Sequence, residues 1–190
     1  PYYYTDYLWR DDHKQTIPEN RDGHRTVYSN DLMADFAVDF VQRHQQEPFF
    51  LYLPFTIPHD NMEVPDLGEY ATKDWPEEAK IYAAMITRLD GYVGRLMAEL
   101  DLLGLAKNTL VFFTSDNGPA HHSFVDFLRS SGGMRGGKAT LYEGGIRMPM
   151  IVRWPGHVPA GQTNDTPWMF ADFLPSCADL AGVSSPAELD

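Results

Sequence analysis

The sequence predicts an α/β fold in which a mainly parallel sheet is flanked by helices. Apolar segments of strand length alternate with helical patterns along the chain, which is typical of βαβ units. The apolar segments are continuous rather than alternating, as in strands buried on both faces of a parallel sheet. The length of 190 residues is sufficient for one hydrophobic core, and the 13% aromatic content argues against disorder.

The first half of the chain contributes a helix and a strand. Residues 1–26 are polar and aromatic without a sustained period, and we expect irregular structure there. Apolar side chains at helical spacing predict a helix over residues 31–44, with Ser29 or Asn30 as its N-cap. The short apolar run at residues 48–54 then predicts a buried strand, and a long loop follows it.

The strongest helical pattern covers residues 77–103, where one apolar stripe runs the whole length and Gly104 suits the C-terminal end. A strand is expected at residues 109–114, and residues 115–147 are glycine-rich and loop-like. The remaining expected elements are a short helix near 124–129, a strand at 150–154 and a final helix at 167–181.

The net charge and the length of the apolar runs argue against two classes of protein, namely nucleic-acid-binding and membrane-spanning proteins. The formal net charge of −12, without a run of basic residues, argues against nucleic acid as a partner, although a local cationic pocket for a small anion remains compatible with it. No apolar run approaches the roughly 20 residues of a membrane span. The single cysteine, Cys177, fits a buried apolar position on the final helix. The chain opens on Pro1, and we expect it to be an internal piece of a longer protein.

Two oxygen-bearing side chains follow the strand at 109–114. Asp116 and Asn117 offer a carboxylate and an amide carbonyl, and oxygen ligands suit Ca²⁺ or Mg²⁺ rather than zinc. An ordinary turn is the alternative, because Asp-Asn-Gly is a common turn sequence. In open α/β sheets ligands gather beyond the carboxyl ends of strands, which favours the metal site.

Two further side chains could bind an oxyanion. Lys138 follows two glycines, and its ammonium could hold a sulfate or phosphate oxygen; a solvated surface lysine is the alternative. His59 follows the strand expected at 48–54 and could bind an oxyanion or protonate a leaving group, or else bond to backbone. The adjacent His121 and His122 lack a third ligand at zinc spacing, so a solvated loop is favoured there, with substrate contact as the alternative.

Several linked segments resemble the arylsulfatase-type sulfatase family in their order. They are residues 58–59, 114–119, 134–138, 141–156, 172–175 and 180–182, and the likeness covers most of residues 27–182. The resemblance implies an alkaline-phosphatase-like fold and hydrolysis of an aryl or carbohydrate sulfate ester. It also implies that Asp116 and Asn117 bind a metal, usually Ca²⁺ with Mg²⁺ possible. Lys138 and His59 would bind the sulfate, and either could assist the leaving group.

The nucleophile of this family is a formylglycine made from Cys or Ser in a Cys/Ser-x-Pro/Ala-x-Arg motif, and residues 1–190 contain no such motif. The family's early aspartate pair and its Lys-x-His pair are not identifiable either. The resemblance therefore implies an incomplete fold: residues 1–190 would be the C-terminal portion of a catalytic domain, with the formylglycine upstream. We expect the isolated chain to be inactive. A periplasmic or secreted location is implied by the family alone.

Two other functions fit the same residues. One is a phosphatase or phosphonate monoester hydrolase of the same superfamily, but such relatives tend to place His where Asn117 stands, so Asn117 with Lys138 favours sulfate. The other is a non-catalytic protein that binds sulfated glycans. The sequence does not identify the substrate; the loops at residues 63–75 and 121–131 are expected to determine specificity.

Overall fold

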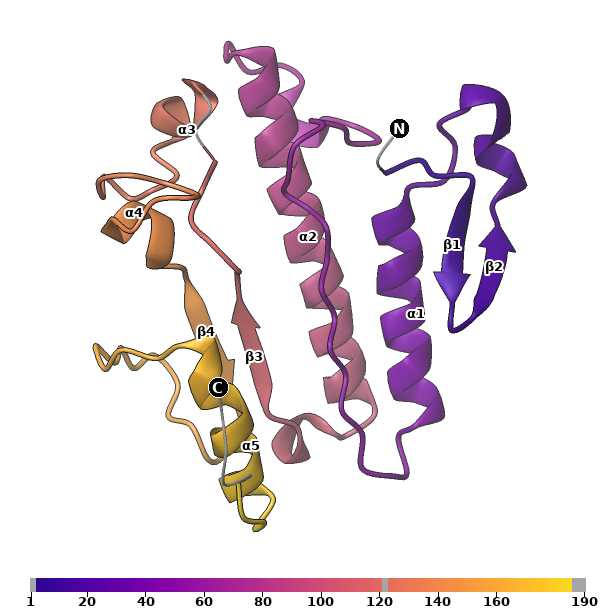
Figure 1. Ribbon diagram of the computed structural model, residues 1–190. Helices are drawn as coiled ribbons and strands as arrows, with labels where there is room; N and C mark the ends of the chain where they lie inside the picture. Colours follow the sequence, from indigo (N-terminus) through magenta and orange to yellow (C-terminus); the bar gives the residue numbers. More distant parts are fainter. Residues whose placement is uncertain (1–2, 121–122, 186–190) are drawn as a thin grey trace. The chain divides into compact units, whose positions relative to one another are not determined.

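The computed structural model describes residues 3–120 and 123–185, and the chain divides into two compact units, Pro1–Val158 and Pro159–Asp190. Figure 1 shows the order of the elements along the chain. The first unit contains the strands and helices β1 (Tyr7–Arg10), β2 (His13–Thr16), α1 (Ser29–Arg43), α2 (Glu77–Leu102), β3 (Val111–Thr114), α3 (Ser123–Leu128), α4 (Glu143–Ile146) and β4 (Met150–Arg153). Its 3₁₀ helices are η1 (Pro18–Gly23), η2 (Gly68–Tyr70) and η3 (Ala106–Asn108). The second unit contains η4 (Phe170–Asp172) and α5 (Phe173–Leu180).

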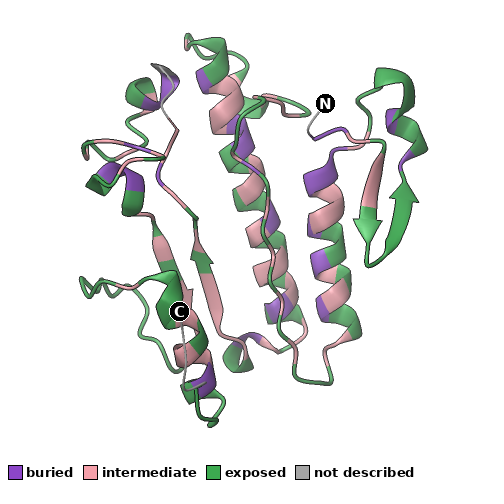
Figure 2. Ribbon diagram, viewed as in Figure 1, coloured by how far each residue is buried: buried purple, intermediate pink, exposed green. Residues whose placement is uncertain are grey.

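Helices α1 and α2 form the main packing contact of the first unit. Each turns a face of buried residues inward, as the purple segments in Figure 2 show. Small residues such as Ala34 on α1 and Ala84 on α2 lie on these faces. The core beside them gathers Tyr3, Tyr28 and Met85, which are almost completely buried. Burial of these rings and side chains contributes about 1.5–3 kcal/mol each, before the cost in conformational entropy.

Helix α2 confirms the strongest helical pattern of the sequence. It runs from Glu77 to Leu102, and Glu77 and Glu78 in its first turn lie where the helix dipole favours negative charge. Gly104 has a φ of +71°, a backbone conformation that glycine adopts without steric cost, and the helix ends just before it.

The predicted start of α1 is wrong. The helix begins at Ser29 and its N-cap is Tyr28, whereas Ser29 or Asn30 was expected as the cap. Asn30 is fully buried, and its Oδ1 accepts hydrogen bonds from the backbone N–H and the hydroxyl of Thr56, both at 3.2 Å. The side chain therefore binds a distant loop, so it is not available to cap its own helix.

The strand pairing differs from the expected parallel arrangement. Among the described residues, both sheets are two-stranded and antiparallel: β1 pairs with β2, and β3 pairs with β4 in the register Phe113↔Ile151. The segment at 48–54 is extended but pairs with no strand in this part of the chain. A run of apolar side chains indicates burial, but a strand also needs a hydrogen-bonding neighbour. One side of the segment is uncovered, since Phe50 and Tyr52 are 69% and 76% exposed.

The expectation of irregular structure over residues 1–26 is also wrong. Strands β1 and β2 form a hairpin there, with Asp11 at its turn in a positive-φ conformation. The ammonium of Lys14 lies 3.7 Å from the centroid of the Tyr7 ring. Periodicity did not reveal the hairpin because its strands are mostly exposed, and an alternating pattern arises only where one face is buried.

The other expected elements are largely confirmed: β3, α3 and β4 lie within one or two residues of the predicted ranges. In the second unit, the helix expected over residues 167–181 begins as η4 and continues as α5, and Gly182, at a φ of +70°, follows it. Cys177 carries a free thiol and is partly rather than fully buried.

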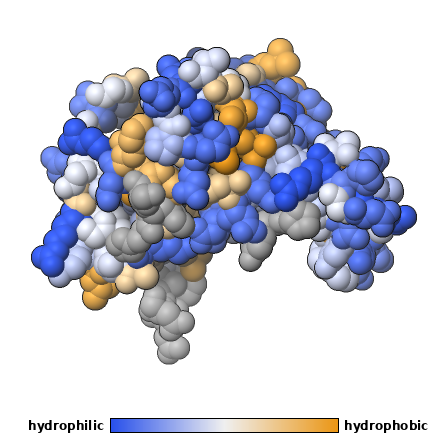
Figure 3. Space-filling view, turned by 90° about the horizontal axis from the view of Figure 1, so that it is seen from above, coloured by the Kyte–Doolittle hydropathy of each residue, from blue (hydrophilic) through white to orange (hydrophobic). Residues whose placement is uncertain are grey.

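The visible surface in Figure 3 is mostly hydrophilic, in keeping with 27 acidic and 15 basic residues, and hydrophobic side chains gather in limited areas. No helix within the described ranges is long and apolar enough to cross a bilayer. Even the long helix α2 carries charged side chains along its length.

Candidate functional site

The turn that carries Asp116 and Asn117 directly follows β3. We call residues 115–118 the cation turn. The Ser115 hydroxyl lies 3.2 Å from the backbone carbonyl of Asn117 and 3.4 Å from Asp116 Oδ1. The Asn117 amide donates through Nδ2 to the carbonyl of Gly118 at 2.9 Å. That bond fixes the amide plane, so Oδ1 is the Asn117 side-chain atom that suits a cation.

The donors in the cation turn fit a hard divalent cation but do not complete its shell. Asp116 is exposed and Asn117 half-buried, and both present oxygen atoms. Ca²⁺ takes about six to eight oxygen ligands. No group of three or more His, Cys, Asp or Glu side chains comes together within the described residues. The turn therefore fits one part of a calcium shell.

A contact between glycine backbones joins the cation turn to the loop that carries Lys138. A β-carbon on Gly118 would lie 1.8 Å from the carbonyl oxygen of Gly144, and one on Gly144 would lie 2.2 Å from that of Gly136. The Gly118 N–H donates to the Gly145 carbonyl at 2.9 Å, and the Gly144 N–H donates to the Arg135 carbonyl at 2.8 Å. Only residues without a side chain allow backbones to approach so closely.

Backbone hydrogen bonds fix the position of Lys138. Its N–H donates to the carbonyl of Pro119 at 2.8 Å, two residues beyond Asn117. The Thr140 N–H donates to the Gly137 carbonyl at 3.1 Å and closes a four-residue turn around Lys138. We call residues 137–140 the lysine turn.

Tyr3, near the N-terminus, positions the loop that carries His59. The hydroxyl of Tyr3, a residue only 3% exposed, lies 3.2–3.3 Å from the backbone carbonyls of Thr56, His59 and Asp60. Asn30 fixes Thr56 from α1, as described above. These contacts hold the loop while the His59 side chain stays exposed.

The two predicted oxyanion ligands meet in space. Lys138 Nζ lies 3.0 Å from His59 Nε2, although 79 positions separate the two residues. An ammonium can only donate, so a hydrogen bond here requires the imidazole tautomer in which Nε2 is the acceptor. An anion between the two groups would accept from the ammonium in place of the imidazole. The positively charged Lys138 ammonium thus lies beside His59 in an otherwise acidic protein.

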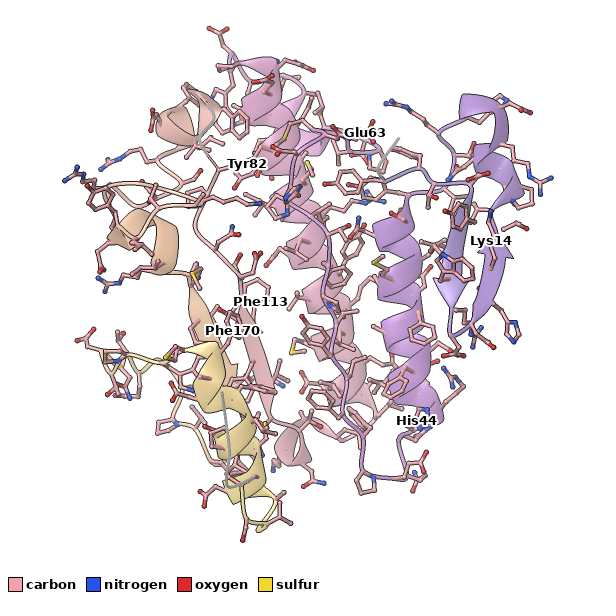
Figure 4. The ribbon with its side chains drawn as sticks, in the orientation of Figure 1. Lys14, His44, Glu63, Tyr82, Phe113 and Phe170 are labelled. Atoms are coloured by element: carbon pink, nitrogen blue, oxygen red, sulfur yellow. The ribbon has the colours of Figure 1, made fainter. Side chains whose placement is uncertain are left out.

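A charged network supports the core behind the His59 loop. Arg88 donates from Nε and Nη2 to the two oxygens of Asp31, at 2.9 and 2.6 Å, and the Tyr92 hydroxyl donates to the same carboxylate. Burial raises the pKa of Tyr92, and its bond to Asp31 adds to that effect. Burial likewise raises the pKa of Tyr28, whose hydroxyl donates to the Glu63 carbonyl at 2.9 Å. In Figure 4 Glu63 lies near the top of α1, while Tyr82 lies between α2 and α3.

Sequence reasoning missed three residues that shape the site, namely Tyr3, Asn30 and Thr140. Tyr3 and Asn30 act on loop atoms 26 to 57 positions away, and no local pattern signals such contacts. Thr140 lies close to Lys138 in sequence, so a turn analysis of the glycine-rich loop could have suggested it. His121 and His122 lie outside the described residues.

Comparisons with known proteins agree with the family suggested by the motifs. The sulfatase family model matches residues 2–183. Steryl-sulfatase of Rattus norvegicus is 38% identical over 166 residues, which cover 82% of this chain and 27% of the rat protein. N-acetylgalactosamine-6-sulfatase of Mus musculus is 36% identical over 161 residues, which cover 83% of this chain and 30% of the mouse protein.

Solved structures give the same result. The crystal structure of Ps i-CgsB matches with a TM-score of 0.75 and 32% identity, over 87% of this chain and 37% of that one. The PsFucS1 sulfatase from Pseudoalteromonas sp. matches with a TM-score of 0.65 and 31% identity, over 80% and 30% of the two chains. The mixed α/β architecture is thus that of sulfatases, although the chain spans only about a third of the length of these proteins. The family match over residues 2–183 and the identity to two curated sulfatases together show that this chain belongs to the sulfatase family.

Proposed function

We propose that this chain forms part of a sulfuric ester hydrolase that releases sulfate from an aryl or carbohydrate sulfate ester. The observation that carries the proposal is the 3.0 Å contact between Lys138 Nζ and His59 Nε2. Lys138 is in turn bonded through its backbone to Pro119, which directly follows the cation turn. These contacts support a site in which the proposed cation ligands and the proposed oxyanion ligands share one scaffold.

Each side chain has a distinct role in the proposed reaction. The Lys138 ammonium binds a sulfate oxygen and offsets the negative charge that develops as the ester bond breaks. His59, once its Nε2 carries a proton, donates to a second oxygen or to the leaving group. Asp116 and Asn117 would hold Ca²⁺, with Mg²⁺ as the alternative, and such a cation would supply Lewis-acid polarisation of the sulfate.

We further propose that residues 1–190 are the C-terminal portion of the catalytic domain of a longer protein. The chain spans 27–30% of the length of the two curated relatives. The segment at 48–54 then joins a parallel sheet built with strands from the rest of that protein. The nucleophile and the remaining metal ligands also come from there. One of the two relatives is named as an N-acetylgalactosamine-6-sulfatase, which supports a carbohydrate sulfate ester as the substrate.

Side-by-side kinetics of the longer protein on an aryl sulfate and an aryl phosphate test this function. We expect faster turnover of the sulfate and a fall in kcat of about 10²-fold or more in Lys138→Ala, as for loss of one oxyanion donor. Lys107→Ala is the matched control, because Lys107 is an exposed lysine in η3. Preference for the phosphate would indicate a phosphatase. Binding of sulfated glycan without any hydrolysis would indicate a non-catalytic protein.

A further inference from the structure

We propose that Thr140 is a positioning residue, whose hydroxyl holds Lys138 in the orientation that an oxyanion needs. The inference rests on the proposed function, because it assigns the group that keeps the anion-binding lysine in place. Thr140 itself touches neither metal nor sulfate in this scheme. Its effect passes through the lysine turn alone.

The Thr140 hydroxyl spans the lysine turn. It donates to the carbonyl of Gly137 at 2.7 Å and accepts from the N–H of the same residue at 3.2 Å. Gly137 is buried, so this N–H would otherwise need water to satisfy it. Ala139, one of the two residues between Gly137 and Thr140, has a φ of +67°, which is costly for a residue with a β-carbon. The hydroxyl therefore closes a turn that the backbone alone would hold less firmly.

Close packing around the Thr140 side chain restricts its position. A β-carbon on Gly136 would lie 2.5 Å from the Thr140 Oγ1, and one on Gly145 would lie 2.8 Å from it. Gly145 also accepts the Gly118 N–H of the cation turn. The hydroxyl thus lies between two glycines, one of which is joined to the metal side of the site. A shift of this side chain would move the turn that aims Lys138 at His59.

A double-mutant cycle in the longer protein separates positioning from a general structural role. The variants are Thr140→Val, Lys138→Ala and the pair, with inorganic sulfate as the binding probe and an aryl sulfate as the substrate. We expect Thr140→Val to weaken sulfate binding and raise KM by about ten- to a hundredfold, as small misplacements of a binding group do. In the Lys138→Ala background the same change should add nothing, because Thr140 acts through Lys138.

Three further variants complete the test. Thr140→Ser keeps the hydroxyl and should restore most of the sulfate affinity. Thr140→Ala removes the hydroxyl without adding a methyl group, and replaces Thr140→Val if the latter fails to fold. Thr109→Val is the matched control, since it loses a hydroxyl–carbonyl bond of 3.0 Å to Leu105 away from the lysine turn.

The outcomes are distinguishable. An equal loss from Thr140→Val in the wild-type and Lys138→Ala backgrounds would overturn the positioning role. Unchanged sulfate affinity in Thr140→Val, beside a clear loss in Lys138→Ala, would overturn it as well. If Lys138→Ala changes neither sulfate affinity nor turnover, the proposed function itself fails and the inference falls with it.

Discussion

Replacing Gly118 by alanine would force two backbone segments of the site apart. The added methyl carbon would lie 1.8 Å from the Gly144 carbonyl oxygen and 2.8 Å from its carbon. An ordinary carbon–oxygen contact is about 3.3–3.6 Å, even for weakly bonded pairs. Both partners are backbone, so no side-chain rotation can relieve the overlap, and the two loops must separate.

The size of the effect follows from what that separation breaks. Two hydrogen bonds join the two segments: the Gly118 N–H donates to the Gly145 carbonyl at 2.9 Å, and the Lys138 N–H donates to the Pro119 carbonyl at 2.8 Å. Loss of each costs about 0.5–1.5 kcal/mol net, and forced overpacking typically costs about 1–3 kcal/mol. We therefore expect Gly118→Ala to lower the free energy of unfolding by about 2–4 kcal/mol, counting partial relaxation of the loops.

The assay is thermal and denaturant unfolding of the longer protein, with Gly94→Ala as the matched control. Gly94 lies exposed on α2 and nothing stands within 4 Å of its missing β-carbon. The control should therefore stabilise by up to about 1 kcal/mol, because alanine is the better helix former. The two glycine-to-alanine substitutions are thus expected to change the free energy of unfolding in opposite directions. A Gly118→Ala variant as stable as the wild type would refute the close contact between Gly118 of the cation turn and Gly144.

Three more predictions test other parts of the structure. Asp116→Ala should weaken Ca²⁺ binding at least tenfold, since it removes one of two donors in the cation turn; unchanged affinity in equilibrium dialysis would favour a simple turn. Tyr3→Phe removes the hydroxyl that faces the His59 loop and should lower kcat/KM severalfold while lowering stability by about 1 kcal/mol, and an effect that persists in His59→Ala would contradict a positioning role. Because burial raises the folded-state pKa of Tyr28 and Tyr92 above the unfolded value of about 10, their contribution to stability is complete below that pH and is lost as pH rises through the folded-state pKa. The phenolate absorbance of these two tyrosines should therefore rise late and together with unfolding. Ionisation of all tyrosines near pH 10 in the folded protein would show the prediction to be wrong.

Local sequence patterns predicted the elements in which the spacing of apolar residues matches the buried face. Helix α2 follows from one apolar stripe with an acidic first turn and a glycine after its end, all of which are local features. Strands β3 and β4 follow from short apolar runs. The hairpin β1–β2 could not be found in this way, because its exposed strands leave no hydrophobic period. The segment at 48–54 misled in the opposite sense, because apolarity does not specify a hydrogen-bonding neighbour.

The same distinction between local pattern and spatial contact applies to the candidate site. The residue types at Asp116, Asn117, Lys138 and His59, and their order along the chain, were enough to indicate a cation and an oxyanion, because ligand chemistry depends on which atoms a side chain carries. Only the tertiary structure shows that Lys138 and His59 lie 3.0 Å apart, since no sequence pattern encodes a contact across 79 positions.

The sequence by itself determined the family, the helices with a clear period and the chemistry of the candidate ligands. The tertiary structure alone decided how those ligands are held: by the contact of Gly118 in the cation turn with Gly144, by the Thr140 hydroxyl, and by the buried Tyr3. The physical reason is that a side chain's identity is local, whereas close approach of two backbones depends on everything that folds between them.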